Sequence, residues 1–283
     1  MKIDKFNFFS DSDFILVFNM TKNEFLEKWD FELQKFNNDF TKFKKSFFLN
    51  LTTWNLAYLQ GQSSMHEAYY SERAFDNLKK YYSSDAFAYM LLRRAFDTKA
   101  VDLYQTMSKF LFPKNERSKI RIINYGCGVS FPYIEMVIED GFINATFADM
   151  PHKTFSLLQS AMEKFNLPVE FIKIESDDVL VKQYDFIICD QVLEHVLEPE
   201  NIVKEFYEHV SDNGFLYLDV WMDDMNGQDP THLRINTERY NRPENFINMV
   251  KNVGFEPFLF EPDTSTPKMW IKKGEKLNTV KSN

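Results

Sequence analysis

Hydrophobic and polar positions divide the chain into a helical first part and a second part in which short apolar strands alternate with helices. Thr21 and Glu24 have the spacing of a capping box, in which two side chains satisfy free N–H groups at a helix start. Large apolar residues then recur every three or four positions from Phe25 to Phe47, which predicts one face of an amphipathic helix. The same spacing predicts three further helices between residues 71 and 112.

The pattern changes after the polar segment 114–119, where we place a boundary between two domains. Alternating strands and helices are typical of a parallel sheet with crossover helices. Predicted strands cover 120–124, 145–148, 169–174, 184–189, 214–220, 258–260 and 269–272, and predicted helices cover 133–139, 154–165, 199–210 and 243–253. We therefore expect a Rossmann-like, seven-stranded, mostly parallel sheet with helices on both faces (118–283), preceded by an all-helical cap that forms a substrate-binding region (1–117).

The length and net charge of the chain limit the classes of substrate that we expect. The 283 residues suffice for one large α/β domain with an added helical segment. The formal net charge is −9, and basic residues occur only as isolated pairs such as Lys44-Lys45. An enzyme that holds nucleic acid usually carries a basic patch. Nucleic acid is therefore a disfavoured substrate, and we expect a small molecule instead.

Neither a membrane span nor a disulfide framework is expected. The longest early apolar run, Phe14 to Phe18, is far too short to cross a bilayer, and the first residues lack the apolar segment of a signal peptide. Cys127 and Cys189 do not form a metal-type pair. We expect a cytoplasmic protein without membrane contact, and a homodimer is compatible with the sequence.

A glycine-containing turn follows the first predicted strand. Gly126 and Gly128 stand where the chain must turn sharply into a helix, and glycine permits both the dihedral angles and the close approach of a ligand to the backbone. In dinucleotide-binding enzymes such a turn holds a pyrophosphate at a helix N-terminus. The third glycine of that fingerprint is missing here, so the turn by itself is a weak signal.

Acidic residues at the next strand ends strengthen the signal. Asp149 closes the second predicted strand, twenty-one residues beyond Gly128, where a carboxylate can accept hydrogen bonds from the ribose hydroxyls of a nucleoside cofactor. The third strand is followed, at the same edge, by Glu175, Ser176 and Asp177. An acid there could accept a hydrogen bond from the amino group of adenine. Each acid alone is also typical of a helix cap or of a solvated loop.

Residues 120–220 resemble the class I S-adenosylmethionine-dependent methyltransferases, in particular their broad small-molecule group. The matching stretches are Ile122-Ile123-Asn124-Tyr125-Gly126-Cys127-Gly128, Tyr184 to Asp190 followed by Gln191-Val192-Leu193-Glu194-His195-Val196, Asp212 to Leu218, and His232-Leu233-Arg234. The Val-Leu-Glu-His-Val segment is the most specific of these.

The resemblance implies S-adenosylmethionine as the cofactor and a set of residues that contact it. The glycine turn would hold the methionine part, Asp149 would hold the ribose, and Asp190 with Gln191 would line the methyl-transfer mouth. The full expected set is Asn124, Gly126, Cys127, Gly128, Ser130, Asp149, Met150, Glu175, Ser176, Asp177, Asp190 and Gln191. The family usually has an acid where Asn124 stands and often a glycine where Ser130 stands.

Methyl transfer to oxygen or nitrogen requires an oriented acceptor and a base near neutrality. His232, in the loop after the fifth strand, is our first candidate for the base, and His195 is the second, with a purely conformational or supporting role as its alternative. No metal site is expected, because convergent ligands are not visible. Tyr69, Tyr70, Trp221 and Asp223 are candidate acceptor contacts, although the aromatic rings are also typical of a helix–helix core.

The sequence therefore predicts a methyltransferase that acts on an oxygen or nitrogen atom of a small molecule. Two alternatives stay open. One is an enzyme that uses S-adenosylmethionine for aminocarboxypropyl transfer or cyclisation, which Asn124 and the large helical cap keep in play. The other is a non-catalytic protein with this fold. An NAD(P) oxidoreductase fits worst, because the third glycine is absent and the fourth strand carries the methyltransferase segment.

Overall fold

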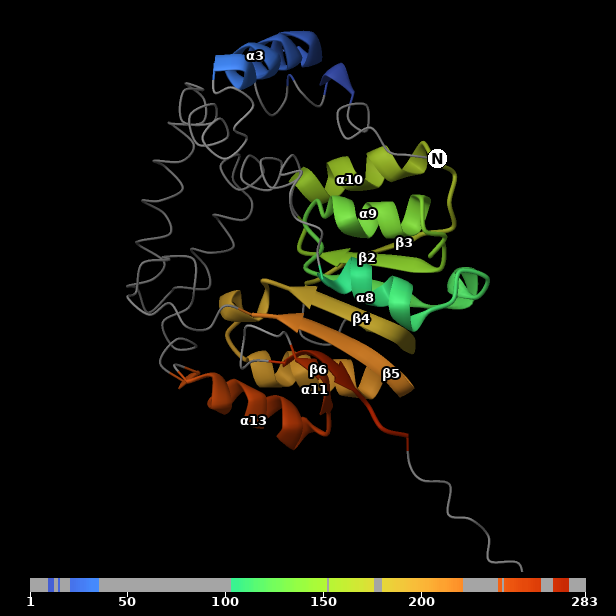
Figure 1. Ribbon diagram of the computed structural model, residues 1–283, viewed down its shortest axis with the longest axis vertical. Helices are drawn as coiled ribbons and strands as arrows, with labels where there is room; N and C mark the ends of the chain where they lie inside the picture. Colours follow the sequence, from blue (N-terminus) through green and yellow to red (C-terminus); the bar gives the residue numbers. More distant parts are fainter. Residues whose placement is uncertain are drawn as a thin grey trace, which may run out of the picture. The chain divides into compact units, whose positions relative to one another are not determined.

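The structure is a computed structural model, and it describes residues 10–12, 15, 21–35, 103–151, 153–175, 180–220, 239–240, 242–260 and 267–274 (Figure 1). Contacts between Cα atoms divide the chain into two compact units. One comprises residues 1–106, 128–140 and 150–167, and the other comprises residues 107–127, 141–149 and 168–283. The predicted domain boundary between residues 117 and 118 stays a prediction.

The second unit contains a seven-stranded sheet, which confirms the predicted mostly parallel architecture. The strands are β1 (Ile122–Tyr125), β2 (Ala145–Asp149), β3 (Glu170–Lys173), β4 (Tyr184–Asp190), β5 (Val210–Asp219), β6 (Glu256–Phe260) and β7 (Pro267–Ile271). Their order in the sheet is β3-β2-β1-β4-β5-β7-β6. The pairs formed by β1 to β5 are parallel, and β7 pairs antiparallel with both β5 and β6.

This strand order places a topological switch point at β1 and β4. From β1 the chain proceeds to β2 and β3 on one side, and it then returns to β4 on the other side. In open α/β sheets, ligands bind outside the carboxyl ends of the strands at such a point. The carboxyl ends of β1 and β4 are therefore where the fold favours a binding site.

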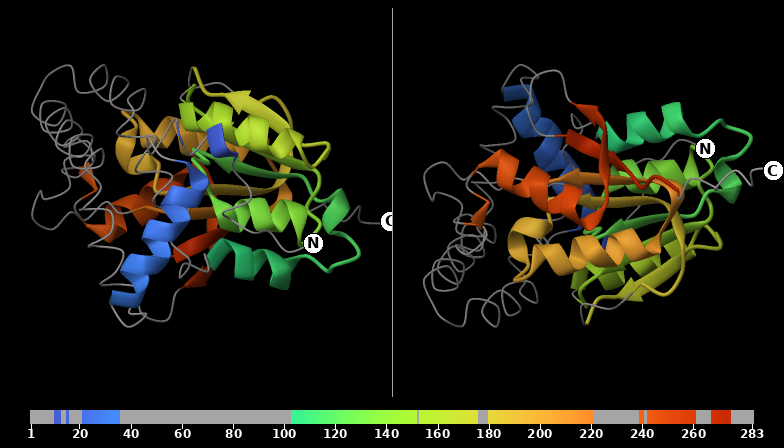
Figure 2. Two further views of the ribbon diagram at one scale, coloured as in Figure 1. Left: turned by 90° about the horizontal axis from the view of Figure 1, so that it is seen from above. Right: turned by 90° about the horizontal axis from the view of Figure 1, so that it is seen from below.

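Alternate side chains of the strands are buried on opposite faces of this sheet. One face packs against α11 (Pro199–His209) and α13 (Pro243–Val253), which lie side by side in both figures (Figures 1 and 2). The buried residues there include Ile123, Ile187, Leu216 and Trp270. Because side chains alternate along a strand, the residues between them face the other way.

A phenylalanine cluster covers the opposite face of β4 and β5. The ring of Phe112, which follows α8 (Leu103–Leu111), lies 6.0 Å from the ring of Phe186 and 6.1 Å from those of Phe142 and Phe215. Burial of one phenylalanine side chain contributes about 1.5–3 kcal/mol. The cluster thus gives a structural role to four of the 30 phenylalanines of the chain.

In the first unit, the predicted capping box of Thr21 and Glu24 is confirmed. The helix α3 spans Lys22–Lys35, with the Thr21 backbone N–H donating to Glu24 Oε2 at 2.7 Å and the Glu24 N–H donating to Thr21 Oγ1 at 3.3 Å. The unit also contains α9 (Phe131–Ile138) and α10 (Lys153–Glu163). The predicted helices between residues 71 and 100 lie outside the described residues. Among the helices that are described, none is long and apolar enough to cross a membrane.

Most boundaries differ from the prediction by one or two residues, and the largest difference is at the start of β5. The helix that we expected to reach Val210 ends at His209, and β5 begins at Val210 rather than at Gly214. Tertiary contacts favour this earlier end, because Val210 pairs with Tyr184 and Lys272 Nζ donates to the carbonyl oxygens of Tyr207 (2.8 Å) and Val210 (3.0 Å). A lysine at the end of a helix satisfies carbonyl groups that have no partner within the helix.

Candidate active site

Four residues occupy one level at the carboxyl edge of the sheet in the second unit. Ala148, Tyr125 and Cys189 are neighbours in register, so the residues that follow them, Asp149, Gly126 and Asp190, lie at the next level. Asp190 is in turn the register partner of Asp219. The row therefore reads Asp149 on β2, Gly126 after β1, Asp190 on β4 and Asp219 on β5.

Gly126 is required at its place in this row, because the side chain of any other residue would meet Val192. Its φ is +70°, and a Cβ atom added there would lie 2.3 Å from Cγ2 of Val192, far inside van der Waals contact. The backbone N–H groups of Gly126 and Cys127 both donate to the carbonyl oxygen of Ala148, at 2.8 and 3.0 Å. The turn is thus held against β2 immediately before Asp149, and the backbone at Gly126 carries no side chain toward a ligand.

Cys127 and Asp149 are buried next to each other beside this turn. The exposed fraction of Cys127 is 5% and that of Asp149 is 9%. Burial raises the pKa of the Cys127 thiol well above its usual range, and the charge of Asp149 and a hydrogen bond to it raise the pKa further. A thiol with a raised pKa is a poor nucleophile, because the thiolate is the reactive form.

In the first unit, Ser130 begins α9 where many family members have glycine. Its side chain is the N-cap of the helix, and Oγ accepts the backbone N–H of Tyr133 at 3.4 Å. The hydroxyl of Tyr104 lies 2.5 Å from the same Oγ atom. Gly128, two residues earlier, has a φ of +50°. Ser130 thus caps α9 and also contacts Tyr104 of α8.

The carboxyl end of β4 turns away from the sheet immediately after Asp190. Gln191 has a φ of +56°, and its N–H donates to the carbonyl oxygen of Asp219 at 2.7 Å. The carboxylate of Asp219 forms an ion pair with Lys268, whose Nζ lies 3.0 Å from Oδ2. The same oxygen accepts a hydrogen bond from the hydroxyl of Tyr217 at 3.3 Å. Asp190 and Gln191, both predicted from the sequence, are therefore brought beside Gly126.

Sequence reasoning missed Asp219 and Lys268. A usable signal was present, because Asp219 follows the apolar residues 215–218 of its strand just as Asp190 follows the apolar residues 186–189 of β4. Aligning the carboxyl ends of the parallel strands would have placed Asp219 in the row. Lys268 carries no such signal, because it comes from an antiparallel strand whose register depends on the fold.

A short turn of Leu193–His195 follows Val192. Glu194 is fully buried, whereas His195 is half-buried and its N–H donates to the carbonyl oxygen of Val192 at 2.9 Å. Burial raises the pKa of Cys189 well above its usual range, and the charges of Glu194 and Asp190 raise it further. The segment is therefore packed into the edge of β4 and supports the position of Val192 against Gly126.

The remaining predicted residues are distributed as follows. Asn124 is buried in β1, Met150 is half-buried after β2, and Glu175 is exposed two residues after β3. Within the described residues, no group of three or more histidine, cysteine or acidic side chains could hold a metal ion. Outside the described residues lie Ser176, Asp177, His232, Tyr69, Tyr70, Trp221 and Asp223.

The sheet order and the turn at its switch point define an α/β protein of the kind that binds a nucleoside cofactor. The family model described as a methyltransferase domain matches residues 91–258, which is more than half of the chain. The chain therefore belongs to the methyltransferase domain family, and the expected class I S-adenosylmethionine-dependent methyltransferase is confirmed at the level of the family.

Curated relatives are ubiquinone biosynthesis O-methyltransferases. That of Rickettsia conorii is 24% identical over 134 residues, which cover 46% of this chain and 45% of the relative. That of Rickettsia prowazekii is 27% identical over 109 residues, which cover 37% of this chain and 41% of the relative. The aligned part thus spans less than half the length of these relatives.

Solved structures with a similar fold include a sugar N-methyltransferase from Streptoalloteichus, with a TM-score of 0.47 and 12% identity over 66% of this chain and 93% of that one. A methyltransferase from Clostridium acetobutylicum has a TM-score of 0.46 and 12% identity over 67% and 97% of the two chains.

Proposed function

We propose that this protein transfers a methyl group from S-adenosylmethionine to an oxygen or nitrogen atom of a small molecule. The observation that supports this most strongly is the row Asp149–Gly126–Asp190 at the switch point of the sheet. It combines a backbone surface without a side chain, a buried carboxylate on one side and a second carboxylate on the other. Membership of the methyltransferase domain family gives the row its cofactor.

The residues present fit that cofactor. A Cβ at Gly126 would meet Val192, so glycine is required in this turn, against whose backbone the proposal places the methionine part. Asp149 is buried at the end of β2, where a carboxylate can accept both ribose hydroxyl groups. In this proposal Met150, Glu175, Ser176 and Asp177 complete the adenosine side.

Asp190 and Gln191 would line the opening through which the acceptor reaches the methyl group. Bound S-adenosylmethionine supplies a methyl group already activated by its sulfonium, so the protein chiefly has to orient the acceptor. An oxygen or nitrogen acceptor must also lose a proton, for which a histidine is suited near neutral pH. We keep His232 as the candidate base, with His195 second, and Tyr69, Tyr70, Trp221 and Asp223 as candidate acceptor contacts.

A small acceptor is favoured over nucleic acid because the chain carries a net charge of −9. The names of the curated relatives support an oxygen acceptor, since all four are O-methyltransferases of ubiquinone biosynthesis. A free small molecule also agrees with a cytoplasmic protein. These points select the class of acceptor and leave its identity to experiment.

Calorimetry of the full chain with S-adenosylmethionine, S-adenosylhomocysteine and NAD tests the cofactor. We expect binding of the first two and none of NAD. Transfer of a labelled methyl group from S-adenosylmethionine to a panel of small phenols, sugars and amines then tests the acceptor. Absence of binding to both sulfur nucleosides would contradict the proposal. If S-adenosylmethionine binds but its aminocarboxypropyl group is transferred in place of the methyl group, the result would support the alternative of aminocarboxypropyl transfer.

A further inference from the structure

Tyr104 reaches the start of α9 from a helix that precedes the whole sheet. Its side chain is fully buried, and its hydroxyl lies 2.5 Å from Oγ of Ser130. A second contact joins the same two helices, because Gln105 Nε2 donates to Glu135 Oε2 at 3.3 Å. Both contacts lie within the first unit.

The chemistry of the two hydroxyl groups suggests a direction for their hydrogen bond. A serine hydroxyl has two acceptor lone pairs and one proton. One lone pair of Ser130 Oγ accepts the N–H of Tyr133. A phenol, with a pKa near 10, is a better donor than an aliphatic alcohol, so Tyr104 donates to the second lone pair. The proton of Ser130 is then the part of this hydroxyl that remains to donate to a ligand.

We propose that Tyr104 is a positioning residue that holds the Ser130 hydroxyl as a hydrogen-bond donor to the carboxylate of the methionine part of S-adenosylmethionine. The inference rests on the proposed function and goes beyond it, because it assigns a role to a residue of the helical segment before the sheet. The N-terminus of α9 supports it, since free N–H groups and the helix dipole favour an anion there. The Tyr104–Ser130 pair would thus take the place of the missing glycine.

The test compares two ligands that differ in their amino-acid end. S-adenosylhomocysteine has the carboxylate, whereas 5′-methylthioadenosine lacks it. We expect Tyr104→Phe to lower the affinity for S-adenosylhomocysteine roughly three- to ten-fold in calorimetry, which is the range that one lost hydrogen bond produces. Binding of 5′-methylthioadenosine should change less than about two-fold, because the adenosine contacts are untouched.

Gln105→Met is the matched control. It removes a different contact between the same helices, so it should lower the melting temperature without changing the ratio of the two affinities. In a Ser130→Ala background, Tyr104→Phe should have no further effect on S-adenosylhomocysteine, because the two residues act as a unit. Ser130→Thr keeps the hydroxyl and should keep the ratio.

An unchanged affinity ratio in Tyr104→Phe, or equal weakening of both ligands, would overturn the proposal. If Tyr104→Phe does not fold, Ser130→Ala and Ser130→Thr decide: the same ratio in both variants would overturn it, and a loss confined to alanine would support it. Failure of the unmodified protein to bind S-adenosylhomocysteine would contradict the proposed function instead, so the two failures are distinguishable.

Discussion

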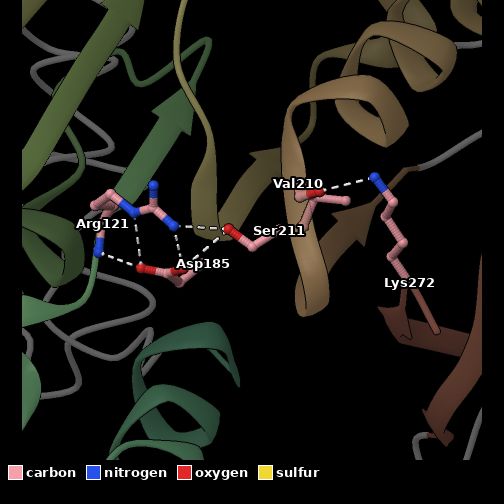
Figure 3. A network of polar contacts seen from close by, with 5 residues as sticks. All are labelled: Arg121, Asp185, Val210, Ser211 and Lys272. Atoms are coloured by element: carbon pink, nitrogen blue, oxygen red, sulfur yellow. Dashed lines mark hydrogen bonds and ion pairs between the residues drawn. The ribbon is translucent and has the colours of Figure 1, made fainter. Parts of the chain in front are cut away.

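The two edges of the sheet in the second unit use charge in opposite ways. At the amino edge, Arg121 donates to the Asp185 carboxylate through its backbone N–H, Nε and Nη2, at 2.7–3.1 Å. Ser211 lies between them, with Oγ 2.8 Å from Arg121 Nη2 and 3.0 Å from Asp185 Oδ1 (Figure 3). An ion pair and a neutral hydroxyl therefore join the amino ends of β1, β4 and β5.

At the carboxyl edge, carboxylates gather on the same strands. Asp149, Asp190 and Asp219 share one level, and Gly126 stands between the first two. Carboxylates on adjacent strands repel one another unless a cation offsets them, as Lys268 does for Asp219, and local departures from good pairing are expected at functional sites. The comparison teaches that one edge of this sheet stabilises the fold, whereas the other is the edge to which the proposed function assigns the ligand.

The largest expected effect is that of Gly126→Ala. The added Cβ combines a left-handed φ with a clash against Val192, so we expect the free energy of unfolding to fall by about 2–4 kcal/mol and cofactor binding to be lost. Chemical denaturation and calorimetry measure the two effects.

Gly141→Ala is the matched control for this change. Gly141 also has a positive φ, +89°, but a Cβ atom there would meet nothing within 4 Å. It should therefore show only the smaller cost of the backbone conformation, about 1–2 kcal/mol, with cofactor affinity unchanged. If both substitutions behaved alike, the close approach to Val192 would have no importance. Val192→Ala should restore part of the stability lost in Gly126→Ala.

The second effect is that of Asp149→Ala, which we expect to weaken S-adenosylmethionine by about 1–3 kcal/mol, the cost of leaving polar groups without partners. Stability should change less than in Gly126→Ala, because the substitution removes a contact of the Cys127 thiol but creates no clash. Calorimetry and thermal unfolding of the same preparation measure both. Full affinity for S-adenosylmethionine would remove Asp149 from the site, and a large loss of stability would show that the two edges do not differ as described.

The smallest effect concerns the amino edge and depends on pH. Burial opposes ionisation of Asp185, but hydrogen bonds from Arg121 and Ser211 and the charge of Arg121 outweigh it and lower its pKa. A lowered folded-state pKa stabilises the protein above the unfolded value, about 3.9, and this stabilisation is lost as the pH falls through the folded value. Asp185→Asn should therefore lower stability at pH 7 by about 1–2 kcal/mol, with cofactor affinity unchanged.

As the pH falls below about 3.9, the difference between Asp185→Asn and the unmodified protein should shrink, because the native carboxyl group is then losing its charge as well. Urea unfolding at several pH values measures this. A difference that stayed constant from pH 7 to pH 3 would mean that the ion pair does not act through its charge. A loss of cofactor binding in this variant would mean that the amino edge also serves the site.

Much of the site was predictable because it depends on local patterns. The glycine turn, Asp149 and the segment from Asp190 onward each follow an apolar strand, and parallel strands must bring their carboxyl ends to one edge. The capping box of Thr21 and Glu24 and the end of α13 at Gly254 were predictable for the same reason. These features depend on residues within a few positions of one another.

The sequence by itself thus determined the family, the mostly parallel sheet, and which strand ends carry glycine and acid. Only the tertiary structure decided that Val192 fills the space beside Gly126, that Cys127 lies against Asp149, and that Tyr104 contacts Ser130. The physical reason is distance along the chain: these partners lie 22 to 66 residues apart, and no local pattern fixes which distant side chain packs against a turn.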